Sequence, residues 1–458
     1  MVSMLMVLEK NAHSGYFLFV MLIAVLLPFI PGPYVAALFF AITLILAIGP
    51  HKNIVPAFSL WGFSFAIFIM SFLSVILGYT DYEFPAYILG ASIFITAAGS
   101  LAATSVRNRG VRKPHLDSKF ISATSSIALI LFGALSACAA AYWITAWMNI
   151  PISLSQLFFL TLIGGVTCAL LESIPSRADK YLTLMMGTGM VMWLFASFGY
   201  YVNFSHLSAT FIFSLFLAYL AYRMDIADVS AMLAATLLGV LIIVFTNLNW
   251  YLILIMFFLL GGAFTKYQYN YKVMRGIAQG KGGVRSYENV LSNSITALIL
   301  AVVYGVYHEL YPALAPVLLF AYLGAVATAT GDTLASEIGE TNRGKPILIT
   351  TLKPVKPGTD GGVTRLGEGV CIGGSVVIGV LALVLGVINI PPASAVTYVV
   401  WLLVVVLGGF GGTNFDSLLG ATLQQKGWLS NSGVNLIATM GGAFISGAAY
   451  YVLCGHVV

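Results

Sequence analysis

Long apolar runs, separated by short polar segments, follow one another from Tyr16 to the C-terminus. Runs of roughly 15 to 24 residues have the length that an α-helix needs to cross a bilayer. The pattern therefore predicts an all-α, polytopic helical membrane protein with about fifteen transmembrane helices. The predicted spans lie near 16–30, 33–49, 55–78, 84–104, 119–142, 152–171, 182–201, 208–222, 229–247, 249–264, 288–307, 312–331, 368–388, 395–412 and 432–453.

Positive charge is distributed unevenly among the loops between these spans. With the N-terminus in the cytoplasm, the alternation of spans places all 21 Lys and Arg residues on the cytoplasmic side. The outer loops then carry only Asp81, Glu83 and Glu309 as charged residues. Lys and Arg concentrate in cytoplasmic loops of membrane proteins, so the charges favour this number of spans and this orientation together. The net charge of +5 is explained by topology and requires no nucleic-acid partner.

Composition agrees with a membrane protein, because 60% of the 458 residues are hydrophobic. The four cysteines, Cys138, Cys168, Cys371 and Cys454, stand singly in apolar stretches without metal-binding spacing. They are typical of small core residues and do not indicate the redox compartment of the protein.

Two stretches of the chain resemble each other. Residues 98–114, AGSLAATSVRNRGVRKP, superpose without gaps on residues 330–346, TGDTLASEIGETNRGKP, at the inner ends of the fourth and twelfth spans. Glu172 and Asp416 end the sixth and fourteenth spans, again eight spans apart. The offset predicts a tandem parallel repeat of seven, one and seven spans, with parts 1–205, 206–224 and 225–458. Chance similarity of short Ala/Gly-rich stretches is the alternative.

The two copies differ at the positions that could bind a cation. Where the second has Asp332 and Glu337, the first has Ser100 and Ser105. Mg²⁺ binds hard oxygen ligands and usually takes one or two carboxylates from the protein, so only the second copy can bind it. We expect residues 1–205 to be a degenerate copy that serves as a scaffold or a lipid-facing wall, although Glu172, Asp179 and the basic residues 107–119 could still contact a substrate.

A polar run, residues 331–369, lies between two apolar segments and contains five basic and five acidic residues in a chain that is 8% charged. Ionisable groups beside a membrane span are costly unless they are paired, hydrated or binding something. Glycines in KPGTDGGVT permit positive φ and close approach of backbone N–H groups to an anion. Carboxylates, glycines and cations together indicate phosphoryl or nucleotidyl transfer. The alternative is a solvated, turn-rich loop that only obeys the positive-inside rule.

Other polar residues at the cytoplasmic ends of spans favour one shared site. Each alone is compatible with a helix cap or an interhelical hydrogen bond, and their common side is the argument. The supporting residues are Asn289, Asn293, Ser336, Asn431 and Asn435.

From about Asp225 onward, the chain resembles the integral-membrane family that includes plant phytyl-phosphate kinase and animal transmembrane protein 19. The matching stretches are DIADVSAMLAATLLG, FFLLGGAFTKY, RSYENVLSNSITALI, TGDTLASEIGE, ITTLKPVKPGTDGGVTRLG and DSLLGATLQ. The usual family wording is nearer ADTWASELG and GTNGGVS, so Gly331 and Asp360 are variants. More remotely, Asp332 with the downstream glycines looks like the arrangement in CTP-dependent polyprenol kinases and CDP-diacylglycerol synthases.

The resemblance implies an Mg²⁺-dependent kinase that uses a nucleoside triphosphate, with CTP as the expected donor, to convert an isoprenyl monophosphate into the diphosphate at the cytoplasmic membrane face. A cytidylyltransferase that makes a CDP-lipid, and a membrane transporter, are the alternatives. The sequence leaves the lipid, the nucleotide and the oligomeric state open. The expected catalytic residues are Asp332, Glu337 and Asp416, the first two holding the metal. The expected nucleotide- and phosphate-binding residues are Lys353, Lys356, Gly358, Thr359, Gly361, Gly362, Thr364 and Arg365.

Overall fold

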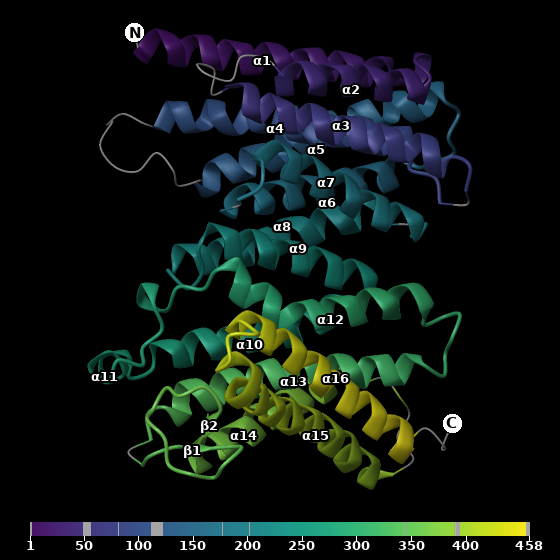
Figure 1. Cartoon of the computed structure of the whole chain (residues 1–458). Helices are drawn as coiled ribbons and strands as arrows, with labels where there is room; N and C mark the ends of the chain where they lie inside the picture. The colour runs from purple at the N-terminus through teal and green to yellow at the C-terminus, as the bar shows by residue number, and fades with distance from the viewer. Residues whose placement is uncertain are drawn as a thin grey trace. The chain divides into compact units, whose positions relative to one another are not determined.

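The computed structural model describes residues 2–48, 56–80, 82–110, 122–175, 177–200, 202–342, 344–388, 390 and 394–454. Helices account for nearly all regular structure in these ranges (Figure 1), which confirms the predicted all-α polytopic architecture. The described part of the chain forms two compact units, Met1–Ala209 and Thr210–Val458. The boundary falls within the segment that the sequence assigns to a linking span.

The first unit consists of helices that run along one another. They are α1 (Val2–Leu26), η1 (Leu27–Phe29), α2 (Gly32–Ile48), α3 (Pro56–Leu77), α4 (Ala86–Gly110), α5 (Ala123–Trp147), α6 (Leu154–Ser173) and α7 (Lys180–Ser197). Helix α8 (Phe204–Arg223) contains the boundary between the units. The stretch 98–114 runs past the described residues at 111, and Arg112, Lys113 and Lys119 lie outside them, so the repeat stays a prediction.

The second unit holds the remaining elements. They are α9 (Val229–Phe245), α10 (Leu248–Lys266), α11 (Tyr269–Met274), η2 (Lys281–Gly283), α12 (Tyr287–Tyr307), α13 (Ala315–Gly339), β1 (Ile347–Leu348), β2 (Gly362–Val363), α14 (Arg365–Val384), α15 (Ala395–Leu419), the π-helical turn η3 (Gly420–Gln424) and α16 (Asn431–Cys454). Strands β1 and β2 pair antiparallel and close a hairpin between α13 and α14.

The number of membrane spans differs from the prediction of fifteen. Among the described residues, eleven helices are long and apolar enough to cross a membrane. Three more predicted spans are apolar helices of at most 17 residues: His13–Phe29, Gly32–Ile48 and Val229–Phe245. The predicted span 182–201 corresponds to α7, whose lysine, threonines and glycines lower its mean hydropathy. Helices of 17 residues are at the lower limit for crossing a bilayer, which explains the difference.

Helix α13 is the central helix of the second unit. It packs against α10, α12, α14, α15 and α16, and 78% of its span is buried. Within a membrane, lipid tails are as apolar as helix surfaces, so apolar contacts alone do little to hold helices together. Close packing through small residues therefore has to fix how the helices are arranged. Thr328 provides such a point, because its hydroxyl donates to the Gly324 carbonyl at 2.8 Å and lies 3.2 Å from the Gly408 carbonyl of α15. A Cβ atom at Gly412 or Gly442 would collide with the Thr328 hydroxyl, so only glycine allows α15 and α16 to approach this closely.

Candidate functional site

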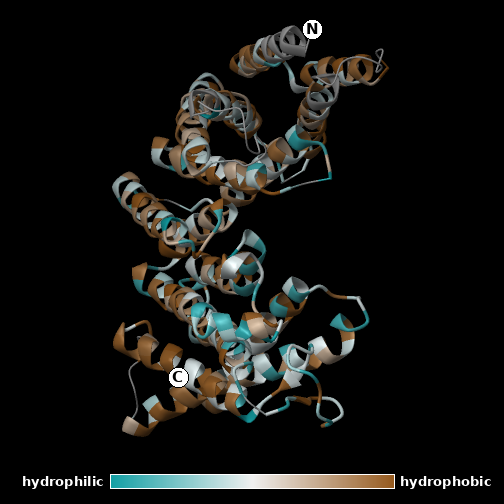
Figure 2. Cartoon of the chain, turned by 90° about the vertical axis from the view of Figure 1, so that its left-hand side faces the viewer, coloured by the Kyte–Doolittle hydropathy of each residue, from teal (hydrophilic) through white to brown (hydrophobic). Residues whose placement is uncertain are grey.

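A polar cavity of about 290 Å³ lies at one end of the second unit, where five helices and the β1–β2 hairpin meet. Figure 2 views the molecule from the side on which α11 and the two strands lie in Figure 1, and hydrophilic stretches of the second unit stand among its apolar helices there. The lining includes Arg285, Asn289, Asn293, Asp332, Ser336, Glu337, Glu340, Gly358, Thr359, Asp360, Gly361, Gly362, Thr364, Glu368, Thr413, Asp416, Asn431 and Asn435.

Two carboxylates face this cavity from neighbouring helices. Asp332 on α13 and Asp416 on α15 each lie four residues, about one helical turn, beyond the contact between Thr328 and Gly412. The glycine-mediated contact therefore fixes both carboxylates at the same level of the helix pair. Among the described residues, no Lys or Arg side chain forms an ion pair with either carboxylate. Their oxygen atoms are available as ligands for a bound cation.

The asparagines at the start of α16 add to this side of the cavity. In the orientation that satisfies both of its neighbours, the Asn435 amide donates to Asp416 Oδ2 and to the Asn431 carbonyl oxygen, each at 3.2 Å. Asn435 thereby fixes one oxygen of Asp416.

The glycine-rich hairpin packs directly on the end of α15. Gly361 has φ +76°, and a Cβ atom there would collide with Ala421, the second residue of the π-helical turn η3. The backbone N–H of Ile349 donates to the Gly361 carbonyl at 3.0 Å, and the Gln425 side chain donates to the Asp360 carbonyl at 2.9 Å. Glycine is required here both for its backbone conformation and for the close approach. The neighbouring turn η3 is π-helical, and π-helical turns within α-helices are frequent at functional sites.

The N-termini of three described helices also meet the cavity. Asn289 and Asn293 lie in the first two turns of α12, and Asn431 begins α16. Thr364 caps α14, and its hydroxyl accepts a hydrogen bond from the Gly367 N–H at 3.0 Å. Helix N-termini carry unpaired N–H groups and a partial positive charge, so this end of the cavity favours an anion such as phosphate.

Arg285 is a lining residue that the sequence analysis did not select. It is only 5% exposed, and its guanidinium lies 5.4 Å from the centre of the Phe257 ring. Burial lowers the pKa of the Arg285 guanidinium, and the nearby Glu337 carboxylate opposes that shift. The signal of Arg285 in the sequence is a charge that precedes Asn289 and Asn293 at spacings of four residues; in the structure Arg285 lies before the N-cap Ser286 of α12 and not on that helix.

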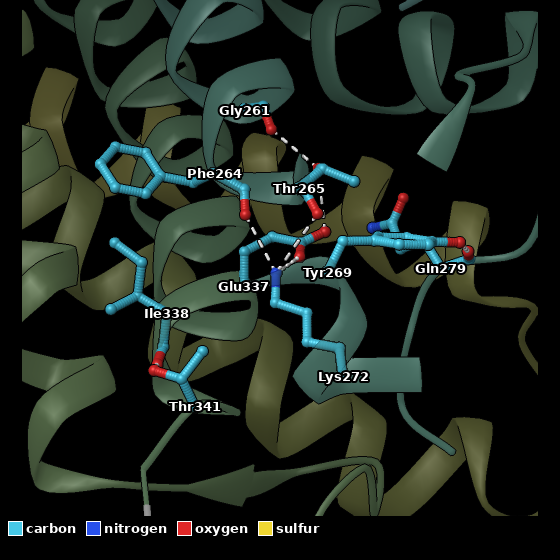
Figure 3. A network of polar contacts seen from close by, with 9 residues as sticks. All are labelled: Gly261, Phe264, Thr265, Tyr269, Lys272, Gln279, Glu337, Ile338 and Thr341. Atoms are coloured by element: carbon cyan, nitrogen blue, oxygen red, sulfur yellow. Dashed lines mark hydrogen bonds and ion pairs between the residues drawn. The ribbon is translucent and has the colours of Figure 1, made fainter. Parts of the chain in front are cut away.

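Glu337 has both carboxylate oxygens engaged within the protein (Figure 3). Its Oε1 accepts a hydrogen bond from the Thr265 hydroxyl at 3.0 Å, and its Oε2 forms a buried ion pair with Lys272. Lys272, 1% exposed, also donates to the Phe264 carbonyl at 3.0 Å. The pair ties α10, α11 and α13 together. Glu337 lines the cavity, but because both of its oxygens are engaged it is less available for a metal than Asp332 or Asp416.

The expected site residues divide into two groups. The three carboxylates, the glycines 358, 361 and 362, the threonines 359 and 364 and all five supporting residues line the cavity. The three expected phosphate-binding cations do not line it: Lys353, Lys356 and Arg365 are exposed. The hairpin presents its backbone to the cavity and its basic side chains to the outside. Arg285 is a buried cation in the lining.

The carboxylates suit a cation that brings most of its own ligands. Among the described residues, no group of three His, Cys, Asp or Glu side chains could hold a metal. Mg²⁺ usually takes one or two protein carboxylates and completes its octahedral shell with water and substrate phosphates. The pair of Asp332 and Asp416 fits this coordination of Mg²⁺ and does not fit a structural metal site, in which the protein supplies all the ligands.

Glu340 adds a group that titrates near neutrality. It follows α13 at the cavity edge, and burial, with a smaller contribution from the Glu337 charge, raises its pKa from 4.5 to about 7. The charge of the cavity therefore changes across physiological pH.

The first unit has its own buried carboxylate. Glu172, whose side chain is 2% exposed, pairs with Lys180 at 2.7 Å and Arg107 at 3.5 Å. The serines that replace the metal-binding positions differ in environment: Ser100 is buried and Ser105 is exposed. In this unit the carboxylate is neutralised by two cations of the same unit.

Comparison with known proteins places the second unit in a family. The model for "Integral membrane protein DUF92" matches residues 212–443. An uncharacterized membrane protein of Methanocaldococcus jannaschii is 30% identical over 49% of this chain and 87% of its own length. Protein PGR of Arabidopsis thaliana is 31% identical over 48% of this chain and 79% of its own length. Protein VTE6, chloroplastic, of the same plant is 28% identical over 47% of this chain and 63% of its own length.

No solved structure matches the chain. The plant relatives confirm the predicted resemblance of the second half to the membrane family that includes plant phytyl-phosphate kinase. The chain is a multi-pass membrane protein and belongs to the integral membrane family DUF92.

Proposed function

We propose that the second unit transfers a phosphoryl group from a nucleoside triphosphate, with CTP the expected donor, to an isoprenyl monophosphate. The observation that carries the proposal is the meeting of two unpaired carboxylates, three helix N-termini and the glycine hairpin at one cavity. The carboxylates suit a metal cation, and the helix N-termini and the glycine hairpin suit phosphate oxygens. The family resemblance supports a lipid monophosphate as the acceptor.

The reaction needs little covalent chemistry from the protein. A phosphate oxygen of the lipid attacks the γ-phosphorus, the bond to the β,γ-bridging oxygen breaks, and the nucleoside diphosphate leaves. A phosphomonoester is already largely dianionic at neutral pH, because its second pKa is about 6, so no strong general base is required. Positioning and charge stabilisation account for most of the catalysis in phosphoryl transfer.

Each part of the cavity then has a role. Asp332 and Asp416 would hold Mg²⁺, which supplies charge neutralisation to the phosphates when it is bound. Asn435 orients Asp416, and the backbone around Gly361 approaches the phosphate oxygens. Glu337, with Lys272, fixes the helix that carries Asp332. The predicted cytoplasmic orientation of the cavity belongs to the proposal.

The test is product analysis with purified protein. Isoprenyl monophosphates of several lengths are incubated with Mg²⁺ and CTP, ATP, GTP or UTP. The expected products are the isoprenyl diphosphate and a nucleoside diphosphate, with at least a roughly 100-fold loss of rate in Asp332→Asn. Asp225→Asn is the matched control, because Asp225 is exposed and does not line the cavity.

Other products would identify the alternatives. Release of pyrophosphate with a nucleotide-linked lipid would establish attack at the α-phosphorus, the cytidylyltransferase reaction. No diphosphate with any nucleotide, or full activity in Asp332→Asn, would overturn the kinase proposal.

A further inference from the structure

A second cavity of about 70 Å³ lies between α8, α9, α10 and α12 of the second unit. Its lining is almost entirely apolar: Leu217, Ala218, Ala221, Ile226, Ala227, Ala231, Met232, Ala235, Tyr251, Ile255, Phe258, Arg285 and Val290. Arg285 is the residue that lines both this cavity and the polar one. The two cavities therefore adjoin at a single buried cation.

Two backbone hydrogen bonds hold Arg285 at this junction, and a glycine opposite it leaves room for its side chain. Its N–H donates to the Ile226 carbonyl, and its carbonyl accepts from the Asp228 N–H, both at 2.9 Å. A Cβ atom at Gly261 would collide with the guanidinium, so a glycine on α10 makes the space that Arg285 occupies. The local fold positions this side chain between two chemically different cavities.

The charge of Arg285 is not neutralised by a direct partner. Within the described ranges no carboxylate forms an ion pair with it, since the nearby Glu337 is already bonded to Lys272 and Thr265. Lys272, Glu337 and Arg285 together carry a net charge of +1. A buried cation is costly unless an anion accompanies it, so the junction favours an anionic group.

The apolar cavity extends from this cation into the span. Along α10, its lining runs from Phe258 back to Tyr251, seven residues that correspond to about 10 Å of helix. Small side chains on α8 and α9, including Ala218, Ala231 and Ala235, leave the space open. A narrow apolar cavity ending at a buried guanidinium matches a molecule with an anionic head and a hydrocarbon tail.

We infer that this cavity binds the chain of the lipid monophosphate next to its head group, and that Arg285 binds the phosphate. The inference rests on the proposed function for the identity of the head group and adds the place of the acceptor. The lipid phosphate bound by Arg285 then faces the polar cavity, where Asp332 and Asp416 lie. The cavity holds only the first part of the chain, and the remainder extends between the helices.

The experiment measures binding without nucleotide. Detergent-solubilised full-length protein is titrated with a C20 isoprenyl monophosphate, the C20 alcohol and a C5 isoprenyl monophosphate. The wild type is expected to bind the C20 monophosphate at least about tenfold more tightly than the C5 monophosphate, because burying about two extra CH₂ groups gives that factor. It is expected to bind the C20 alcohol at least about tenfold more weakly than the C20 monophosphate, because the alcohol lacks the phosphate that forms charge-assisted hydrogen bonds with Arg285.

Two variants separate head group from tail. Ala235→Phe fills the apolar cavity and is expected to weaken binding of the C20 monophosphate about tenfold and binding of the shorter C5 compound by a smaller factor. Arg285→Gln is expected to weaken both monophosphates by about tenfold or more and to leave the alcohol unchanged. Ala263→Phe is the matched control, because Ala263 is an exposed residue of α10 outside the cavity.

Arg285→Lys keeps the charge and checks folding, so unchanged alcohol binding and partial monophosphate binding are expected. Equal affinity for the three compounds in the wild type, or full C20 monophosphate affinity in a folded Ala235→Phe variant, would overturn the inference. Binding as expected without product in the presence of nucleotide would overturn the kinase proposal alone. Product formation with no effect of Ala235→Phe on binding would overturn only the assignment of the tail cavity.

Discussion

The two units use buried carboxylates differently. In the first unit, Glu172 is neutralised by Lys180 and Arg107. In the second, Glu337 is neutralised by Lys272 in the same way, but Asp332 and Asp416 remain without a basic partner among the described residues and face a cavity. A paired carboxylate stabilises helix packing, whereas an unpaired one at a cavity is available to a ligand. We therefore propose that the second unit binds the ligand and that the first unit supports it.

The largest effect is expected from breaking the pair of Glu337 with Lys272. Lys272→Met leaves a buried, unpaired carboxylate and should lower the free energy of unfolding by about 3–5 kcal/mol. The corresponding Lys180→Met change should cost roughly 1 kcal/mol, because the Lys180 side chain is 46% exposed and Arg107 stays beside Glu172. Unfolding in detergent, followed by circular dichroism, measures both.

A double variant checks the cause. Adding Glu337→Gln to Lys272→Met removes the unpaired charge and should restore a large part of the lost stability. Equal losses for Lys272→Met and Lys180→Met would mean that the two pairs do not differ in burial as described.

The next effect separates binding from support. Asp416→Asn should reduce kcat/KM for diphosphate formation by roughly 100-fold with little change in stability, because the charge faces the cavity. Glu172→Gln should show the opposite pattern, with lower stability and nearly unchanged kcat/KM. A larger loss of activity in Glu172→Gln than in Asp416→Asn would reverse the assignment of the two units.

The glycine-mediated packing in the second unit gives a smaller effect. Gly442→Ala places a Cβ against the Thr328 hydroxyl and 2.9 Å from the Gly408 carbonyl, so helices must shift, at a cost of about 1–3 kcal/mol. Gly373→Ala on α14 is the matched control: its Cβ meets nothing within 4 Å, and alanine favours a helix over glycine. Thermal unfolding of the two variants should move in opposite directions, and equal losses would show that Thr328 is not a tight packing point.

The smallest effect is a pH dependence. The pKa of Glu340 rises from 4.5 to about 7 on folding. The unfolded chain therefore loses this proton first, and the contribution of Glu340 makes stability fall as pH rises from about 4.5 to about 7. Above pH 7 the ionised carboxylate also repels phosphate.

Nucleotide affinity compared at pH 6 and pH 8 measures the second consequence. The decrease at the higher pH should be roughly threefold greater in the wild type than in Glu340→Gln. Identical pH profiles for the two proteins would contradict the shifted pKa.

Hydropathy and charge predicted the helical membrane architecture, and polar residues at span ends predicted most of the cavity lining. The sequence could not predict that Glu337 pairs with Lys272, because 65 residues separate them and the contact depends on how α11 packs. The exposure of Lys353, Lys356 and Arg365 depends on the pairing of β1 with β2, which involves two residues from each strand. In the sequence Arg285 is only one of the Lys and Arg residues on the predicted cytoplasmic side, because its burial depends on Phe257 and Gly261 of α10.

Binding of a metal–nucleotide complex to the cavity tests the proposed roles of Asp332 and Asp416 without relying on turnover. Mn²⁺ with CTP, or with ATP, GTP or UTP if CTP does not bind, is titrated into the protein and followed by electron paramagnetic resonance. A bound Mn²⁺–nucleotide signal is expected in the wild type and in Glu172→Gln, and its loss is expected in Asp332→Asn and Asp416→Asn. An unchanged bound signal in both aspartate variants would contradict these roles.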